Sequence, residues 1–175
     1  MQLVTENLIL CPLEVGHIDA FRRSRRGLGR LLGAAVPEEW PWPETAEILP
    51  WLRLQLADEV SPPEWLAWLF IHTASATLIG DGGFSGPPSR AGVTEMGYNI
   101  LPAFRHCGYG YEAAERLARW AFEQPRTKTL HANTLPAGAA SARILRKLGM
   151  RRTRTTPDIV CWTLKKGVFL KRHRE

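Results

Sequence analysis

The chain is poor in cysteine and lacks any long uninterrupted hydrophobic run. Its 3 cysteines, Cys11, Cys107 and Cys161, are odd in number and widely spaced, which fits neither a disulfide framework nor a structural zinc site. The longest apolar run, residues 65–71, is far shorter than a membrane-spanning helix, and Glu6 lies where a signal peptide carries positive charge. We therefore expect free thiols, no membrane partner and a cytoplasmic location.

Metal-binding spacings are also missing, because none of the 5 histidines belongs to a His-Glu-x-x-His or Cys-x-x-Cys type of motif. We expect no metal. The formal net charge of +6 is concentrated in two basic clusters. They are Arg22, Arg23, Arg25, Arg26 and Arg30, and Lys165, Lys166, Lys171, Arg172 and Arg174. Such clusters favour an acidic or ribosome-associated partner, but they also form ordinary solvated surfaces, and we do not expect nucleic acid.

The hydrophobic pattern predicts one α/β (α+β mixed) domain over residues 1–175. Predicted strands lie at 3–13, 65–72, 77–84, 93–101, 129–134 and 160–164. Predicted helices lie at 17–32, at 46–58 with Thr45 as N-cap, from the glycine loop to Pro125, and at 139–148 with Gly149 as C-cap. Residues 37–43 read as a loop. This order predicts a mixed, mostly antiparallel sheet flanked by helices.

The most informative segment is the glycine loop from Arg105 to Tyr111, which follows a predicted strand and opens a predicted helix. Gly108 and Gly110 allow the backbone to turn with its amides exposed, and the helix adds the positive end of its dipole. Arg105 adds a forked cationic donor. These features predict a phosphate site.

The same loop matches the dinucleotide pattern Gly-x-Gly-x-x-Ala. That pattern belongs to the first strand and helix of its domain, with a carboxylate about 20 residues further on. Here the loop begins beyond residue 100, and the next predicted strand, 129–134, has no carboxylate. The context therefore argues against a dinucleotide.

Five segments of the chain resemble the GNAT superfamily of acyl-CoA-dependent N-acyltransferases, in particular its ribosomal-protein-serine/alanine N-acetyltransferase branch. They are 8–13 (LILCPL), 41–43 (PWP), 95–98 (EMGY), 101–105 (LPAFR) and 140–150 (ASARILRKLGM). The resemblance implies a sheet with a V-shaped split between the fourth and fifth predicted strands, and acetyl-CoA as cosubstrate. It implies coenzyme binding by Ile100, Leu101, Arg105, His106, Cys107, Gly108, Tyr109, Gly110, Tyr111 and Asn133.

The resemblance also assigns catalytic and acceptor roles. It implies that Glu95 removes the proton of the amine, although a salt bridge on an exposed strand is the alternative. Ser141 is the available acid for the leaving thiolate, or a local capping residue. Trp40 and Trp42 form a wall over the acceptor, or pack the loop on the core.

Two departures from the family pattern leave an alternative open. The last predicted helix has no tyrosine to act as acid, and Gly138 stands where the branch carries an asparagine, so we expect Asn133 to substitute. An acyl-cysteine route through Cys107 lacks a paired base. We expect an N-acetyltransferase that acts on a protein N-terminus or a small amine, and the family implies a homodimer as one assembly. The alternative is a non-catalytic coenzyme- or nucleic-acid-binding module.

Overall fold

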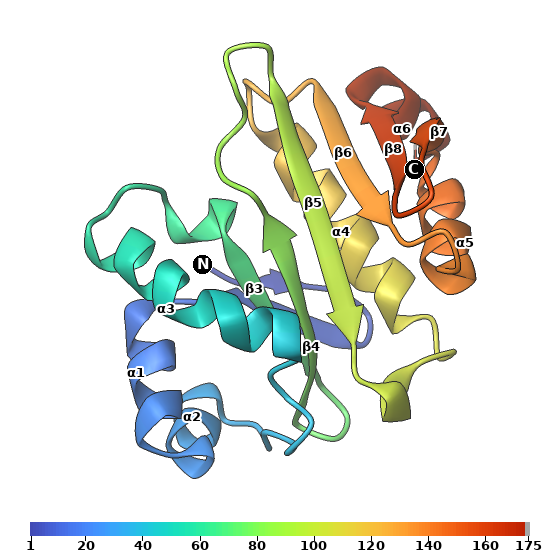
Figure 1. Ribbon diagram of the computed structural model, residues 1–175. Helices are drawn as coiled ribbons and strands as arrows, with labels where there is room; N and C mark the ends of the chain where they lie inside the picture. The colour runs from blue at the N-terminus through green and yellow to red at the C-terminus, as the bar shows by residue number, and fades with distance from the viewer. Residues whose placement is uncertain (174–175) are drawn as a thin grey trace.

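The chain folds around one eight-stranded sheet (Figure 1). The structure, a computed structural model, describes residues 1–173. The strands are β1 (Leu3–Val4), β2 (Leu8–Pro12), β3 (Ala67–His72), β4 (Thr77–Phe84), β5 (Val93–Ile100), β6 (Thr129–Thr134), β7 (Arg151–Thr155) and β8 (Val160–Lys165). Their order is β1-β2-β3-β4-β5-β6-β8-β7, and only β5 and β6 pair in parallel. The predicted mixed, mostly antiparallel sheet is confirmed.

Helices cover both faces of this sheet. They are α1 (Val15–Arg23), α2 (Arg25–Leu32), α3 (Pro43–Ala57), α4 (Tyr109–Glu123), α5 (Ala139–Leu148) and α6 (Lys166–Arg172), with 3-10 turns η1 (Pro63–Trp65) and η2 (Pro102–Phe104). Trp68 and Phe70 of β3 pack with α4, α5 and α6, whereas the alternate residues Leu69 and Ile71 pack with α1, α2 and α3. The central strands are therefore apolar on both faces.

The sheet splits between β5 and β6, the fourth and fifth of the predicted strands. These strands pair only from Val93 to Glu95, opposite Thr129 to His131. Beyond that point Met96 to Ile100 pairs with β4 alone, and the rest of β6 pairs with β8. Figure 1 shows β5 and β6 diverging toward the end of β5. The predicted V-shaped split is confirmed.

Two predicted elements are each divided by a polar residue. The strand predicted at 3–13 is a hairpin, because the hydroxyl of Thr5 bonds the backbone of Leu8 and closes a turn between β1 and β2. The helix predicted at 17–32 breaks at Ser24, which is extended (φ −169°, ψ 147°) and whose Oγ accepts from the Gly27 amide at 2.9 Å. Ser24 thus caps a new helix, α2, because its side chain offers the backbone an alternative partner.

The start of the third helix also differs from the prediction. It begins at Pro43, with Trp42 at the N-cap position, and not at residue 46. Proline suits the first helical turn, where its missing amide hydrogen has no intrahelical acceptor. Thr45 is not a cap, because it is buried and its hydroxyl donates to Asp81.

The elements β7 and α6 were not predicted from the sequence. Every residue of β7 is exposed, so this edge strand lacks the hydrophobic alternation that marks a half-buried strand. Helix α6 has one fully buried anchor, Phe169, which packs on α4 through Phe122. Of the C-terminal basic cluster, Arg174 lies outside the described residues.

Candidate functional site

Two cavities adjoin at the open part of β5. The first, here called the loop cavity, has a volume of about 690 Å³ and lies between β5, the glycine loop and the start of α5. The second, the helix cavity, has a volume of about 490 Å³ and lies between α3, β4 and β5. Tyr98 and Asn99 line both. One strand thus separates two spaces that a pair of reactants could occupy.

The glycine loop presents a row of backbone donors. Gly108 is the N-cap of α4 with φ 90°, and His106 also has a positive φ of 64°. Within residues 1–173, the amides of residues 106–110 donate to no protein acceptor. Unpaired amides at a helix N-terminus form an anion-binding site. The geometry of the predicted phosphate loop is therefore present.

Among the described residues, three basic side chains and no carboxylate line the loop cavity. The basic residues are Arg105, His106 and Arg143. Arg105 Nε donates to the Ile100 carbonyl at 2.9 Å, and its guanidinium lies 5.2 Å from the ring centroid of Trp42. These contacts fix the guanidinium at the edge of the loop, where it complements an anion.

The edge of β5 that faces the split is open from Met96 onward. The Leu101 amide donates to Ile79 of β4, and amides alternate sides along a strand, so the Ile100 amide points to the open side. Ile100 lines the loop cavity. Leu101 does not: it is 2% exposed, and its carbonyl accepts from the Phe104 amide. The backbone amide of Ile100, and not that of Leu101, is therefore free toward the split, while the Ile100 carbonyl accepts from Arg105.

Glu95 lies at the last residue pair that β5 shares with β6. It is exposed and lines the helix cavity. Asn133 Nδ2 donates to Glu95 Oε1 at 2.9 Å. Asn133 therefore orients the carboxylate from β6, and its predicted contact with the coenzyme stays a prediction.

Ser141 and Tyr98 bring two hydroxyl groups into the loop cavity. Ser141 lies in the first turn of α5, whose N-cap is Gly138. Burial raises the pKa of Tyr98, and the neighbouring Ser141 hydroxyl opposes that rise by a smaller amount. Within residues 1–173, no contact of the buried Tyr98 oxygen reaches hydrogen-bonding geometry.

Two residues of the predicted loop site point away from the cavity. The Cys107 thiol is exposed and donates to the Arg105 carbonyl at 3.4 Å. The Tyr109 hydroxyl bonds His72 Nε2 at 2.9 Å, so its side chain packs against β3. Cys107 and Tyr109 can therefore contact an anion in the loop only through their backbone amides. Gly108, Gly110, Tyr111 and Ile100 line the cavity, and their contact with the coenzyme stays a prediction.

The two tryptophans expected beside the acceptor do not line the helix cavity. Trp40 is a core residue, 1% exposed, and its indole nitrogen donates to Asp81 Oδ2 at 2.7 Å. Trp42 stacks under Arg105. The exposed aromatic of the helix cavity is Trp51, at 48% exposure.

Sequence reasoning missed Glu44, Trp51 and Asp81. Glu44 and Trp51 lie two turns apart on the solvent-facing side of α3, with Ile48 between them. This spacing repeats the helical period, and it was the sequence signal that could have placed these residues on one face of the helix. Asp81 sits among the glycines of β4 and gave no pattern.

The split sheet and the loop at its mouth define an acetyltransferase fold. The chain belongs to the acetyltransferase (GNAT) domain family, whose sequence model matches residues 7–151. The predicted resemblance is confirmed at this level.

Three relatives illustrate the likeness. The uncharacterized N-acetyltransferase YjdG of Bacillus subtilis is 26% identical over 147 residues, which cover 84% of this chain and 88% of that protein. A GNAT-family acetyltransferase of Bacillus anthracis has a TM-score of 0.64 at 17% identity, covering 95% of this chain and 99% of the other. The ribosomal-protein-S5-alanine acetyltransferase of Vibrio fischeri has a TM-score of 0.64 at 14% identity, covering 95% and 97%. At these identities the two structures show the fold alone.

The described residues hold neither a metal-binding cluster nor a membrane-spanning helix. Among residues 1–173, no group of three or more His, Cys, Asp and Glu side chains is arranged to hold a metal ion. In the same part of the chain, none of the helices has the length and hydropathy needed to cross a membrane.

Proposed function

We propose that this protein transfers an acetyl group from acetyl-CoA to a primary amine by direct attack on the thioester. The observation that carries the proposal is the pairing of two cavities of opposite charge along the open edge of β5. The basic loop cavity suits the phosphates of the donor, and the acidic helix cavity suits a protonated amine. The two reactants would meet beside Tyr98.

The loop residues fit a phosphorylated acyl carrier. The free amides of residues 106–110 would bind its pyrophosphate, and Arg105 and Arg143 would neutralise it. A Cβ on Gly110 would lie 3.1 Å from Ile144 Cδ1, so glycine keeps that part of the cavity open. The Ile100 amide would hydrogen-bond the bound carrier from the open edge of β5.

Glu95 is the proposed general base. Its carboxylate lines the helix cavity on the side where the amine would bind, and Asn133 leaves Oε2 free to accept a proton. Glu95 takes a proton from the ammonium group, and the amine nitrogen then bonds the carbonyl carbon of the acetyl group. The carbon–sulfur bond breaks, and Ser141, which lines the loop cavity, would donate a proton to the departing thiolate. The nitrogen loses its surplus proton as the amide forms, and that proton would restore the Ser141 hydroxyl. Backbone donors on β5 would stabilise the oxyanion.

Acetyl-CoA binding, measured by calorimetry on the purified protein, tests the donor half of the proposal. We expect Arg105→Ala to raise the Kd about tenfold or more, the effect of one lost charged hydrogen bond. Gly108→Val, placed at φ 90°, should abolish binding because a β-branched residue does not adopt that conformation.

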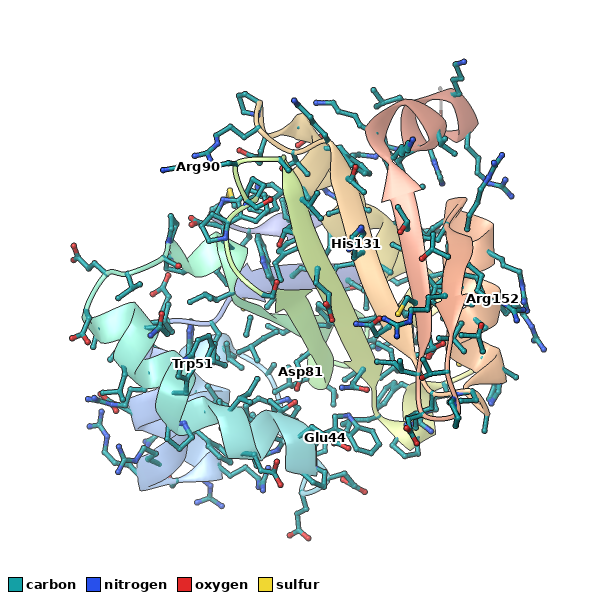
Figure 2. All side chains as sticks on the ribbon, turned by 45° about the horizontal axis from the view of Figure 1, so that its top comes forward. Glu44, Trp51, Asp81, Arg90, His131 and Arg152 are labelled. Atoms are coloured by element: carbon teal, nitrogen blue, oxygen red, sulfur yellow. The ribbon has the colours of Figure 1, made fainter. Side chains whose placement is uncertain are left out.

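Arg90→Ala is the matched control, because Arg90 is exposed and lines neither cavity. Arg90 is labelled in Figure 2 and lies in the segment between β4 and β5. It removes the same charge and should leave the Kd unchanged. Absence of acetyl-CoA binding in the wild type would overturn the proposal. Binding without thiol release for any amine would favour a non-catalytic coenzyme-binding module.

A further inference from the structure

The helix cavity is acidic although the chain as a whole carries a net charge of +6. Glu44 of α3, Asp81 of β4 and Glu95 of β5 contribute three carboxylates from three different elements. Within residues 1–173, no lysine, arginine or histidine lines this cavity. The two basic clusters lie elsewhere, on α1 and α2 and at the C-terminal end of the described chain.

Asp81 is the most buried of these carboxylates. It is 6% exposed and accepts hydrogen bonds from the Trp40 indole at 2.7 Å and from the Thr45 hydroxyl at 3.1 and 3.2 Å. Both donors are neutral. The ion pairs of the described chain, Arg53 with Asp19 and Arg119 with Glu115, do not involve it. Buried carboxylates are ordinarily paired with a cation. Asp81 has no such partner in the described chain, so it faces the cavity as a charge without a counterion.

The wall between the carboxylates is apolar. Ile48 and Trp51 project from α3 with exposures of 47% and 48%. Phe84 contributes from β4. Figure 2 shows Asp81 beside α3, the helix that carries Glu44 and Trp51. An apolar surface of this kind packs against methylene groups, and an indole face also attracts an ammonium group.

We propose that the helix cavity selects an acceptor with two positive charges, a primary amine joined through a short apolar spacer to a second ammonium group. This inference rests on the proposed function, because Glu95 then serves the amine that is acetylated. Asp81 and Glu44 hold the second ammonium group, and Ile48 and Trp51 pack on the spacer. The basic clusters suggested an acidic or ribosome-associated acceptor. Such an acceptor does not fit this cavity, because the charge of the cavity is opposite in sign to that of the basic clusters.

Three acceptors with the same number of carbon atoms separate the effect of charge from the effect of the hydrocarbon chain. They are 1,4-diaminobutane, 1-aminobutane and 4-aminobutanoate, which share a primary amine and end in an ammonium, a methyl and a carboxylate group. We expect kcat/KM, measured as acetyl-CoA-dependent thiol release, to be about tenfold or more higher for the diamine than for aminobutane, as for one charged hydrogen bond. The carboxylate should be the poorest acceptor, since it meets three like charges.

Two isosteric variants test which carboxylates cause the preference for the diamine. Asp81→Asn and Glu44→Gln should each reduce the ratio of kcat/KM for the diamine to kcat/KM for aminobutane. The reduction should be about tenfold for the buried Asp81 and smaller for the exposed Glu44, whose charge is screened by water. Glu47→Gln is the control, because Glu47 is exposed on the same helix and does not line the cavity. It should leave the ratio unchanged.

Direct binding keeps this inference distinct from the proposed function. Calorimetry should detect diaminobutane binding to the wild type and its loss in Asp81→Asn, whether or not turnover occurs. Equal kcat/KM for diaminobutane and aminobutane in the wild type would overturn the inference and leave the acetyltransferase proposal intact. A preference for 4-aminobutanoate would overturn it as well. Diamine binding without thiol release for any amine would support the cation site and overturn the catalytic proposal.

Discussion

Replacement of Asp81 by asparagine should make the folded protein more stable at neutral pH. Burial raises the pKa of Asp81 from 3.8 to about 6, and Glu44 adds a smaller repulsive effect. The Trp40 and Thr45 hydrogen bonds act in the opposite direction but do not compensate. The ionised carboxylate is therefore disfavoured in the folded state. An asparagine oxygen can still accept from both donors, and it carries no charge.

The magnitude follows from the difference between the two pKa values. Each pKa unit corresponds to 1.36 kcal/mol, so a rise from 3.8 to about 6 disfavours the folded state by about 3 kcal/mol when Asp81 is ionised. Below pH 3.8 both states are protonated and this cost is absent. Between pH 3.8 and about 6 the unfolded chain loses its proton first, so stability falls as pH rises. Above about pH 6 the full cost applies.

The assay is urea unfolding of the wild type and Asp81→Asn at pH 4, 5, 6 and 7. About 0.6 kcal/mol of the cost is already present at pH 4, so the difference in unfolding free energy should move in favour of the variant by about 2.4 kcal/mol between pH 4 and pH 7. For a chain of this length that equals a relative Tm gain of about 5–10 °C. Titrations of groups common to both proteins largely cancel in the difference. A difference that is constant with pH, or that moves against the variant as pH rises, would refute the reasoning.

Three further predictions concern the reaction. Glu95→Gln should lower kcat by about 10²–10⁴-fold with little change in the acetyl-CoA Kd; turnover at the wild-type rate would remove Glu95 as the base. Gly110→Val should raise the acetyl-CoA Kd about tenfold or more, because its side chain would meet Ile144, and wild-type affinity would place the donor elsewhere. Ser141→Ala should lower kcat by roughly tenfold, less than acid–base catalysis commonly contributes, because a thiolate leaves readily. Normal steady-state thiol release in that variant would exclude Ser141 as the acid.

Elements with strong local signals could be predicted from the sequence. Residues 129–134 and 139–148 match β6 and α5, because alternation marks the strand and Gly149, with φ 96°, ends the helix. The helix break at Ser24 was not predicted, and Thr45 was predicted as an N-cap, because the same side chain can cap a helix, break one or bind a distant carboxylate. Tertiary contacts decide among these roles, and sequence spacing does not record them.

The two cavities also differ in how well they could be predicted from the sequence. The glycine loop is contiguous, so its chemistry is visible in a few adjacent letters, and Arg105 and Gly108 were found. The helix cavity is assembled from α3, β4 and β5. Glu44 and Asp81 are 37 positions apart in the chain, and only the packing of α3 on the sheet brings both to the same cavity. Trp40 was assigned a place in the wall because its buried contact with Asp81 has no local signal.

The position of Asp81 also connects stability with ligand binding. Trp40 and Thr45 hold a carboxylate that disfavours the folded state above about pH 6, and Glu44 increases that effect. A bound cation would reverse the sign of the local interaction, because it favours the ionised form of Asp81. By linkage, the cation should then bind more tightly as Asp81 loses its proton, and its binding near pH 6 should release protons. An acceptor with a second ammonium group would thus stabilise the fold most at neutral pH, where the unliganded cavity disfavours it most.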